Sequence, residues 1–329
     1  MQNNCIINFT INYETCKSLE IYKICETCEI AVENGHLGCL KYLRENKFSW
    51  DSRICKKSAR KGNLDCLKYA HENGCPWDVR TCLEAAKNGH LDCLKYAHEN
   101  NCPWDESICF ESSRNGHLDC LKYAHENGCP WDKNTCLFAA ENGHLDCLKY
   151  AHENGCPWNE IITEEAAKNG HLECLKYAHE NECPRSEWVC VYSVINGNLE
   201  CLKYAHENRY PWNEWVCAFV CEYGFLECLK YAHENGCPWD KNECLKLAIK
   251  NNKNSIVNFI ENLLKNEKKD EVADGSLISS TCNICLQNKK CVFYQPCGHV
   301  SSCWACSSKM KNCPDCRTKI YGFFKVFFP

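Results

Sequence analysis

Short apolar stripes separated by turn residues recur along most of the chain. Within residues 81–108, one stripe covers 82–86 and a second covers 91–97. Gly89 lies between them, and glycine readily adopts the left-handed conformation that ends a helix. Pro103 prevents the second helix from continuing. Because no segment of the unit alternates with period two, the pattern predicts a helix-turn-helix pair without strands.

This unit repeats every 27 residues. Its turn glycines are Gly35, Gly62, Gly89, Gly116, Gly143, Gly170, Gly197 and Gly224, and its tryptophans are Trp50, Trp77, Trp104, Trp131, Trp158, Trp212 and Trp239. The spacing predicts eight repeats over residues 27–243. Residues 244–265 lose the tryptophan and the turn glycine and become more polar, which is typical of the capping repeat that an open-ended array needs. Residues 1–26 are predicted to form an N-terminal helical cap.

The segment CLEAAKNGHLDCLKYAHENG, residues 82–101, resembles the ankyrin repeat in its first helix, its Asn-Gly-His-Leu turn and its second apolar helix. The resemblance implies a helical solenoid that binds other proteins. Ankyrin repeats run to about 33 residues, and the shorter unit carries CPWD where ankyrins project a β-hairpin finger. Arrays of this short type resemble those of large DNA viruses of protists.

Cysteine makes up 34 of the 329 residues, near the level of a disulfide scaffold. The beginning of the chain nevertheless lacks the basic and apolar regions of a secretory leader. The chain also contains no run of about 18 apolar residues, so we expect no membrane span. We therefore expect free thiols in a reducing compartment, which is the cytoplasm (the host's, if the protein is viral) or the nucleus.

The repeat accounts for 22 of the cysteines, and two interpretations compete for them. They form a ladder of metal or redox sites, or they are small buried apolar residues. Phe48, Tyr210 and Thr163 occupy cysteine positions of other repeats, and an aromatic ring can replace a packing residue but not a thiolate ligand. Asn63 and Asn198 likewise replace a repeated histidine. This favours packing for the thiols, and hydrogen bonds between neighbouring repeats for the histidines over metal binding.

The second helix of the unit hardly changes between repeats, whereas the first helix does. One first-helix position holds in turn Ile30, Lys57, Glu84, Glu111, Phe138, Glu165, Tyr192 and Phe219. Recognition positions are free to differ between repeats, and aromatic side chains are common interface anchors. We therefore predict a substrate-binding surface, and the alternative is a locally altered core. The candidate residues are Phe138, Trp188, Tyr192, Trp215 and Phe219.

Residues 266–280 contain few apolar residues and are predicted to be a linker. The following 49 residues, 281–329, have the spacing Cys282-x2-Cys285-x11-Cys297-x-His299-x3-Cys303-x2-Cys306-x6-Cys313-x2-Cys316. Structural zinc takes four sulfur or imidazole ligands, so the eight residues predict two zinc ions. A domain of this size has little core, and zinc should supply most of its folding free energy. The spacing itself leaves open whether the ligands pair sequentially or crosswise.

The order of these ligands resembles the RING finger of ubiquitin ligases. The resemblance implies a cross-brace, with Cys282, Cys285, Cys303 and Cys306 on one zinc and Cys297, His299, Cys313 and Cys316 on the other. The segments PCGHVSSCWAC (296–306) and CPDCR (313–317), with the tail RTKIYGFFKVFFP, resemble the inhibitor-of-apoptosis group in particular.

That subtype implies specific contacts. The groove for the ubiquitin-conjugating enzyme (E2) would use Ile284 and Pro314, and Arg317 would hydrogen-bond both the E2 and ubiquitin. The tail would form a homodimer through Phe324, with Phe327 touching the ubiquitin held by the other protomer. The alternative for FFKVFF is a strand that closes the domain itself; both can hold, because such a strand on so small a domain needs a partner.

Charge bears on the choice of partner. The net formal charge is −5, while residues 281–329 carry seven Lys/Arg and one acid. This division suggests two domains with different roles. Once seven thiolates and two Zn²⁺ are counted, the C-terminal segment keeps too little positive charge to predict nucleic acid binding.

We therefore predict a mainly α chain, with an ankyrin-like solenoid followed by a small zinc-stabilised α+β RING domain. The predicted function is that of a RING-type E3 ubiquitin ligase. Its array recruits a protein substrate, and its RING positions a ubiquitin-charged E2, with no covalent ubiquitin intermediate on this chain. Two alternatives remain: a non-catalytic scaffold whose RING only dimerises, and a nucleic-acid or metal-buffering protein that uses the repeat Cys and His.

Overall fold

The computed structural model describes residues 25–275, 292–295, 300–302, 307, 309–312, 317, 319–320 and 322–325. Contacts divide the chain into two units, Met1–Val257 and Asn258–Pro329. Among the described residues, no helix is both long enough and apolar enough to cross a membrane. The predicted cap over residues 1–26 lies outside the described residues except for Cys25 and Glu26.

Eight helix pairs follow the 27-residue period. The first helices are α2 (Cys28–Glu33), α4 (Ser52–Lys61), α6 (Val79–Lys87), α8 (Ser107–Arg114), α10 (Lys133–Glu141), α12 (Ile161–Asn169), α14 (Val189–Ile195) and α16 (Glu214–Tyr223). The second helices are α3 (Leu37–Glu45), α5 (Leu64–Glu72), α7 (Leu91–Glu99), α9 (Leu118–Glu126), α11 (Leu145–Glu153), α13 (Leu172–Glu180), α15 (Leu199–Glu207) and α17 (Leu226–Glu234). A ninth pair consists of α18 (Lys241–Lys250) and α19 (Asn254–Gly275). The predicted helix-turn-helix unit is confirmed.

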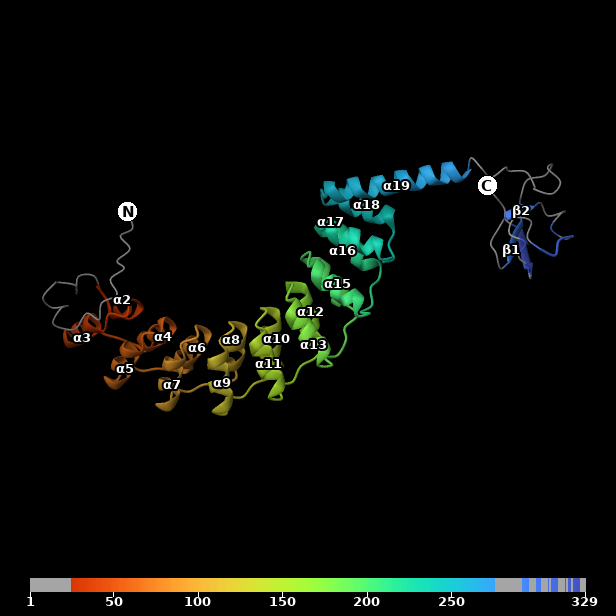
Figure 1. Cartoon of the computed structure of the whole chain (residues 1–329). Helices are drawn as coiled ribbons and strands as arrows, with labels where there is room; N and C mark the ends of the chain where they lie inside the picture. Colours follow the sequence, from red (N-terminus) through yellow and green to blue (C-terminus); the bar gives the residue numbers. More distant parts are fainter. Residues whose placement is uncertain are drawn as a thin grey trace. The chain divides into compact units, whose positions relative to one another are not determined.

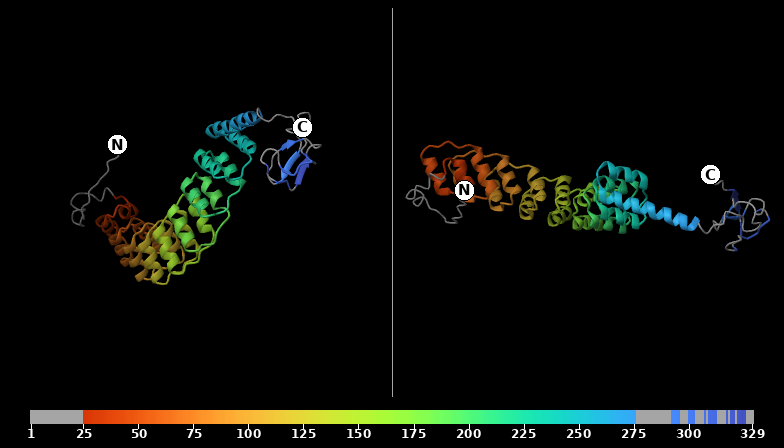
Figure 2. Two further views of the ribbon diagram at one scale, coloured as in Figure 1. Left: turned by 45° about the vertical axis from the view of Figure 1, so that its right-hand side comes forward. Right: turned by 90° about the horizontal axis from the view of Figure 1, so that it is seen from above.

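Within the first unit, the first helices form one row and the second helices form another, as Figures 1 and 2 show. Successive first helices make many contacts with one another, whereas successive second helices make few. The first-helix row therefore lies on the inner side of the curved stack (Figure 1).

Aspartates of the CPWD segment, and of FSWD at residues 48–51, precede many of the first helices. The carboxylates of Asp51, Asp78 and Asp132 each accept a hydrogen bond from the backbone N–H two residues further on. Such a cap satisfies one of the four amides that a helix N-terminus leaves unpaired. The segment that replaces the ankyrin finger therefore starts the next repeat.

The core of the array consists mainly of cysteine, leucine and alanine. In α7, Cys93, Leu94 and Ala97 are at most 1% exposed, and the same positions are buried in the other second helices. Every cysteine within residues 25–275 is buried, and none of them is in a disulfide. Burial raises the pKa of Cys66 and Cys93 to about 12, so these thiols stay protonated at neutral pH. This burial is what the packing interpretation of the repeat cysteines predicts.

A histidine of the second helix joins most of the repeats to the next. The His125 ring stacks on Trp131 with a centroid distance of 3.8 Å, and its Nδ1 is hydrogen-bonded to the Tyr150 hydroxyl at 2.9 Å. The same contacts recur at His71, His98, His152 and His206. Where Arg185 replaces the tryptophan, His179 bonds to Tyr210 instead.

The histidine after the turn glycine makes a second link. His90 Nε2 lies 3.1 Å from the Arg60 carbonyl oxygen, and His117 Nε2 lies 3.1 Å from that of Lys87. Asn63, which takes the place of this histidine, donates to the Val32 carbonyl oxygen at 2.6 Å. The structural interpretation of the repeat histidines is therefore confirmed where these contacts occur.

Helix α19 corrects the predicted linker. We expected an irregular tether from residue 266, but the helix continues to Gly275. Residues 266–274 contain mostly Glu, Lys, Asp and Ala and no Gly or Pro. Charged and small residues of this kind sustain a helix without an apolar stripe, so periodicity alone missed it.

The second unit contributes a three-stranded antiparallel sheet within its described residues. Its strands are β1 (Val292–Gln295), β2 (Val300–Ser302) and β3 (Gly322–Lys325), in the order β2-β1-β3. Phe293 pairs with Val300 on one side and with Phe324 on the other. Residues 322–325 of the predicted tail therefore form an edge strand of this sheet.

Candidate functional site

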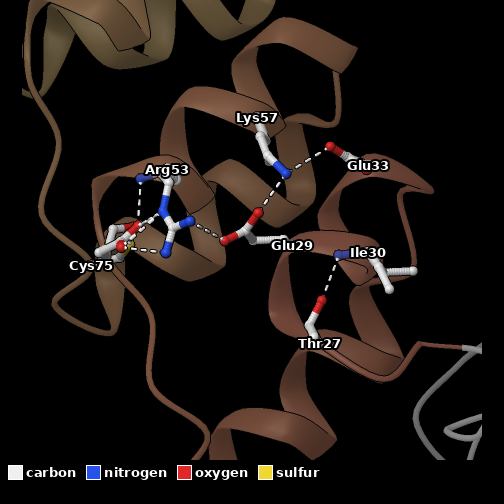
Figure 3. Close-up of polar contacts among 8 residues, drawn as sticks. Thr27, Glu29, Ile30, Glu33, Arg53, Lys57 and Cys75 are labelled. Carbon is white, nitrogen blue, oxygen red and sulfur yellow. Dashed lines mark hydrogen bonds and ion pairs between the residues drawn. The ribbon is translucent and has the colours of Figure 1, made fainter.

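The first-helix row, here called the inner row, begins with ion pairs between charged side chains. Lys57 of α4 lies 2.5 Å from a Glu29 carboxylate oxygen and 2.8 Å from one of Glu33, and Arg53 lies 3.0 Å from Glu29, as Figure 3 shows. The hydrogen bond from Lys57 lowers the pKa of Glu33, and the one to Glu29 raises the pKa of Lys57. Glu84 continues the row within 3.6 Å of a Lys56 nitrogen. The positive and negative side chains in this part of the row therefore largely neutralise one another.

The inner row is aromatic further along the array. On α16, Trp215, Phe219 and Tyr223 are spaced four residues apart, which places them on one side of the helix. Their ring centroids are 6.3 Å and 6.1 Å apart in sequence order. Trp188 precedes the neighbouring α14, which carries Tyr192. We call these five residues the aromatic face.

The two interpretations of these aromatic residues predict different exposure of their side chains. Trp215 is 51% exposed, and Trp188 and Tyr223 are each 41% exposed. Tyr192 and Phe219 are half-buried. The two tryptophans therefore do not fill an altered core, and apolar area is accessible at this face.

Phe138 lies apart from the aromatic face. Its ring is 5.7 Å from that of Phe110 and 5.2 Å from the Arg114 guanidinium, both on α8. Helix α12, which carries Glu165 at the variable position, lies between α10 and α14. The structure therefore does not bring Phe138 together with the other four candidates.

Tyr223 was not among the predicted contacts. The prediction compared one first-helix position across repeats, and Tyr223 occupies another. The spacing of Trp215, Phe219 and Tyr223 along a single helix was the signal that would have found it.

The eight predicted zinc ligands, Ile284, Pro314 and Phe327 lie outside the described residues. Arg317 is described: it is exposed and has a φ of 60°. A β-bridge joins Asn312 to Lys319, and the predicted ligands Cys313 and Cys316 fall between them in sequence. The donor set of seven thiols and one imidazole suits zinc.

Two family models match the chain. Residues 278–323 match "Zinc finger, C3HC4 type (RING finger)", and residues 82–161 match "Ankyrin repeats (3 copies)". These matches cover the zinc-ligand segment and three of the repeats described above.

Similar proteins match short parts of the chain. The Drosophila melanogaster "Death-associated inhibitor of apoptosis 2" is 36% identical over 66 residues, which are 20% of this chain and 12% of that protein. The "Apoptosis inhibitor IAP" of Cydia pomonella granulosis virus is 38% identical over 64 residues, 20% of this chain and 22% of that protein. The Dictyostelium discoideum "E3 ubiquitin-protein ligase cblA" is 39% identical over 46 residues, 14% of this chain and 7% of that protein. The chain thus spans less than a quarter of the length of each of these relatives.

The chain therefore carries ankyrin repeats and a C-terminal RING finger similar to those of inhibitor-of-apoptosis proteins, one of them viral. The predicted fold class is confirmed. A RING finger binds zinc, so a zinc cofactor follows from the match.

Proposed function

We propose that this protein is a RING-type E3 ubiquitin ligase whose repeat array recruits a protein substrate. The RING match at residues 278–323, shared with a protein named as a ubiquitin ligase and with apoptosis inhibitors, is the observation that carries the proposal. The ligase holds the E2 thioester close to a substrate lysine, and the rate comes from positioning. The buried thiols of the array require a reducing environment, which fits the cytoplasm or the nucleus.

Two zinc ions hold the RING in this proposal. The first is bound by Cys282, Cys285, Cys303 and Cys306, and the second by Cys297, His299, Cys313 and Cys316. Zinc is structural here: it fixes the loops that meet the E2, and the chemistry takes place on the E2. The segments between the ligands hold Ile284 and Pro314 in an apolar groove for the E2.

Arg317 is the proposed residue that joins E2 and ubiquitin. Its guanidinium presents donors in a fixed planar arrangement, which suits carbonyl oxygens on two partners at once. Its exposure and its position one residue after Cys316 support this role. A hydrogen bond to a charged donor contributes about 1.5–3 kcal/mol, so its loss should slow transfer about tenfold or more.

The aromatic face is the proposed substrate contact. Tryptophan and tyrosine contribute large contact areas at low cost in side-chain entropy, and they dominate many interfaces. The exposed Trp188 and Trp215 support this assignment, whereas Phe138 is a weaker candidate because it packs on α8. Proximity labelling by the full chain would identify the substrate, which should be labelled less by a Trp188→Ala/Trp215→Ala variant.

The tail also supports a homodimer. Strand β3 is an edge strand of the described sheet, and an unpaired edge invites a partner. In the proposed dimer Phe324 contacts the second copy, and Phe327 contacts the ubiquitin held by that copy. Dimerisation makes substrate capture bivalent.

Autoubiquitination by the purified full chain, with a broad panel of E2 enzymes, tests the ligase proposal. We expect ubiquitin chains with at least one E2, about tenfold fewer for Arg317→Ala, and none for Cys282→Ser/Cys303→Ser. Arg209→Ala is a matched control, because Arg209 also has a φ of 60° but lies in the array. If no E2 gives chains while the zinc content is intact, the non-catalytic scaffold is the correct reading.

A further inference from the structure

The N-terminal end of the array brings two thiols and an imidazole together. The Sγ atoms of Cys25 and Cys39 and a ring nitrogen of His36 all lie within 4.8 Å of one another. Cys25 Sγ is 3.2 Å from His36 Nδ1. Both cysteines are buried, and His36 is half-buried. Elsewhere in the part of the chain that the structure describes, no other three such groups converge in this way.

The next repeat lacks this set of groups. The positions 27 residues further on are Ser52, Asn63 and Cys66. Asn63 uses its amide to bond the Val32 carbonyl, and Cys66 is a buried thiol. In all the other repeats, the position of Cys25 is likewise occupied by a residue other than cysteine. The first repeat therefore differs from the others in a residue that the repeat pattern does not require.

The histidine of the first repeat also has a contact with sulfur. In later repeats the equivalent histidine reaches back to the preceding repeat, as His117 Nε2 does to the Lys87 carbonyl at 3.1 Å. His36 Nδ1 lies beside the Cys25 thiol of its own repeat, 3.2 Å from Sγ. One ring nitrogen of His36 is therefore placed against sulfur.

Two thiolates and one neutral imidazole form a donor set that zinc prefers. In a tetrahedral zinc site the ligand atoms are about 3.5–3.8 Å apart, given metal–ligand distances of about 2.0–2.3 Å. The observed separations are close enough for side-chain rotation to reach that geometry. Two thiolates also neutralise Zn²⁺, so the site carries no net charge. Burial would penalise a site with a net charge.

We propose that Cys25, His36 and Cys39 bind one zinc ion, with water as the fourth ligand, and that this ion stabilises the N-terminal end of the array. Cys25 lies three residues before the first residue of α2, while His36 and Cys39 lie at the beginning of α3. The ion therefore ties the entry of the first helix to the second helix of the same repeat. Such a link would hold the two helices of the first repeat together.

The metal content of the full chain tests the proposal. Zinc per chain is measured by mass spectrometry of the metal after removal of loosely bound ions, for the wild type and for Cys25→Ser and His36→Asn. Serine and asparagine are the residues found at these positions in the next repeat, so both variants should fold. We expect each variant to hold one zinc ion fewer than the wild type. Because the zinc content of each variant is compared with that of the wild type, the result does not depend on how many ions the RING holds.

Cys66→Ser is the matched control, because Cys66 is the buried equivalent of Cys39 without the other two ligands. It should keep the full zinc content. Substitution with Co²⁺ adds a second measurement. The absorption spectrum of the Cys25→Ser variant is subtracted from that of the wild type, and the difference should show the sulfur-to-cobalt absorption of a site with thiolate ligands. Equal zinc content in the wild type and Cys25→Ser would overturn the proposal. A Cys25–Cys39 disulfide, detected as two fewer titratable thiols than the reduced chain, would also overturn it.

Discussion

The two helix rows of the array differ in how much they vary. The second helices are almost identical from repeat to repeat, and LDCLKYAHE alone occurs four times. Their conserved tyrosine and histidine make the hydrogen bonds between repeats, such as His125 to Tyr150. The first helices carry ion pairs in α2 to α6 and exposed aromatic rings on α16.

This difference separates two kinds of work within one unit. A position whose side chain links one repeat to the next cannot change without losing contacts on both sides. A first-helix position whose side chain faces solvent is free of that constraint, so it can adapt to a partner. Substitutions in the second-helix row should therefore act on stability, and those on the aromatic face should act on binding.

The largest expected loss of stability is at a leucine of the second-helix row. Leu121 is fully buried in α9. Its replacement by alanine leaves a cavity and should lower the free energy of unfolding by about 3–5 kcal/mol. Leu118→Ala in the same helix is the control, because Leu118 is only half-buried and should cost less. Urea unfolding followed by circular dichroism measures both, and equal losses would contradict the assignment of the core.

A somewhat smaller loss should distinguish two glycines on either side of α9. Gly116 and Gly128 have φ values of 74° and 78°. A Cβ at Gly116 would lie 2.6 Å from His144 Nδ1, whereas a Cβ at Gly128 would have no atom within 4 Å. Alanine in this conformation costs about 1 kcal/mol, and the clash at Gly116 should bring its loss to about 2 kcal/mol or more.

The chain itself supports that distinction. The turn after the first helix is glycine in all eight repeats, whereas the turn after the second helix also accepts Asn101, Glu182 and Arg209 at positive φ. Urea midpoints of Gly116→Ala and Gly128→Ala check the order of the two losses. Equal destabilisation would show that the backbone conformation alone, and not contact with the next repeat, explains the glycine in the turn after the first helix.

How far the sequence predicts the structure depends on which interactions repeat. The helix pairs and their turn glycine were predictable, because the same local pattern occurs eight times. The extent of α19 was not, because residues 266–274 favour a helix through propensity without an apolar stripe. Tyr223 was missed because it departs from the position compared between repeats.

The cluster at Cys25 shows a different limit. Nothing in the local sequence pairs Cys25 with His36, since the two lie eleven residues apart and only the turn between α2 and α3 brings them together. The RING ligands were predictable for the opposite reason: their spacing is itself the information. Their positions lie outside the described residues, so their pairing remains a prediction.

A pH effect should also distinguish the repeat histidines. Burial lowers the pKa of His117 and His171, so the folded state disfavours their protonation. The unfolded state binds these protons at the ordinary histidine pKa of about 6.5. The contribution of these residues is therefore complete above that pH and is lost as the pH falls below it towards the lowered folded-state values.

The variant His117→Asn/His171→Asn checks this sign. Asparagine already fills the position at Asn63 and Asn198, where it donates to carbonyl oxygens of the preceding repeat. The variant should lose less stability than the wild type between pH 7.5 and pH 5.5, measured by urea midpoint. The carboxylates are the same in both chains, so they cancel in the comparison. An identical pH dependence would contradict the assignment.

The smallest effect on stability should come from the aromatic face. Trp215 is 51% exposed, and surface substitutions usually change the free energy of unfolding by less than about 0.5 kcal/mol. Trp215→Ala should therefore leave the urea midpoint almost unchanged. Trp131→Ala is the matched control: it removes the same side chain, but from the stack on His125, and should destabilise the array measurably. If the two variants lost equal stability, Trp215 would belong to the scaffold, and the division of work between the two rows would fail at its most exposed residue.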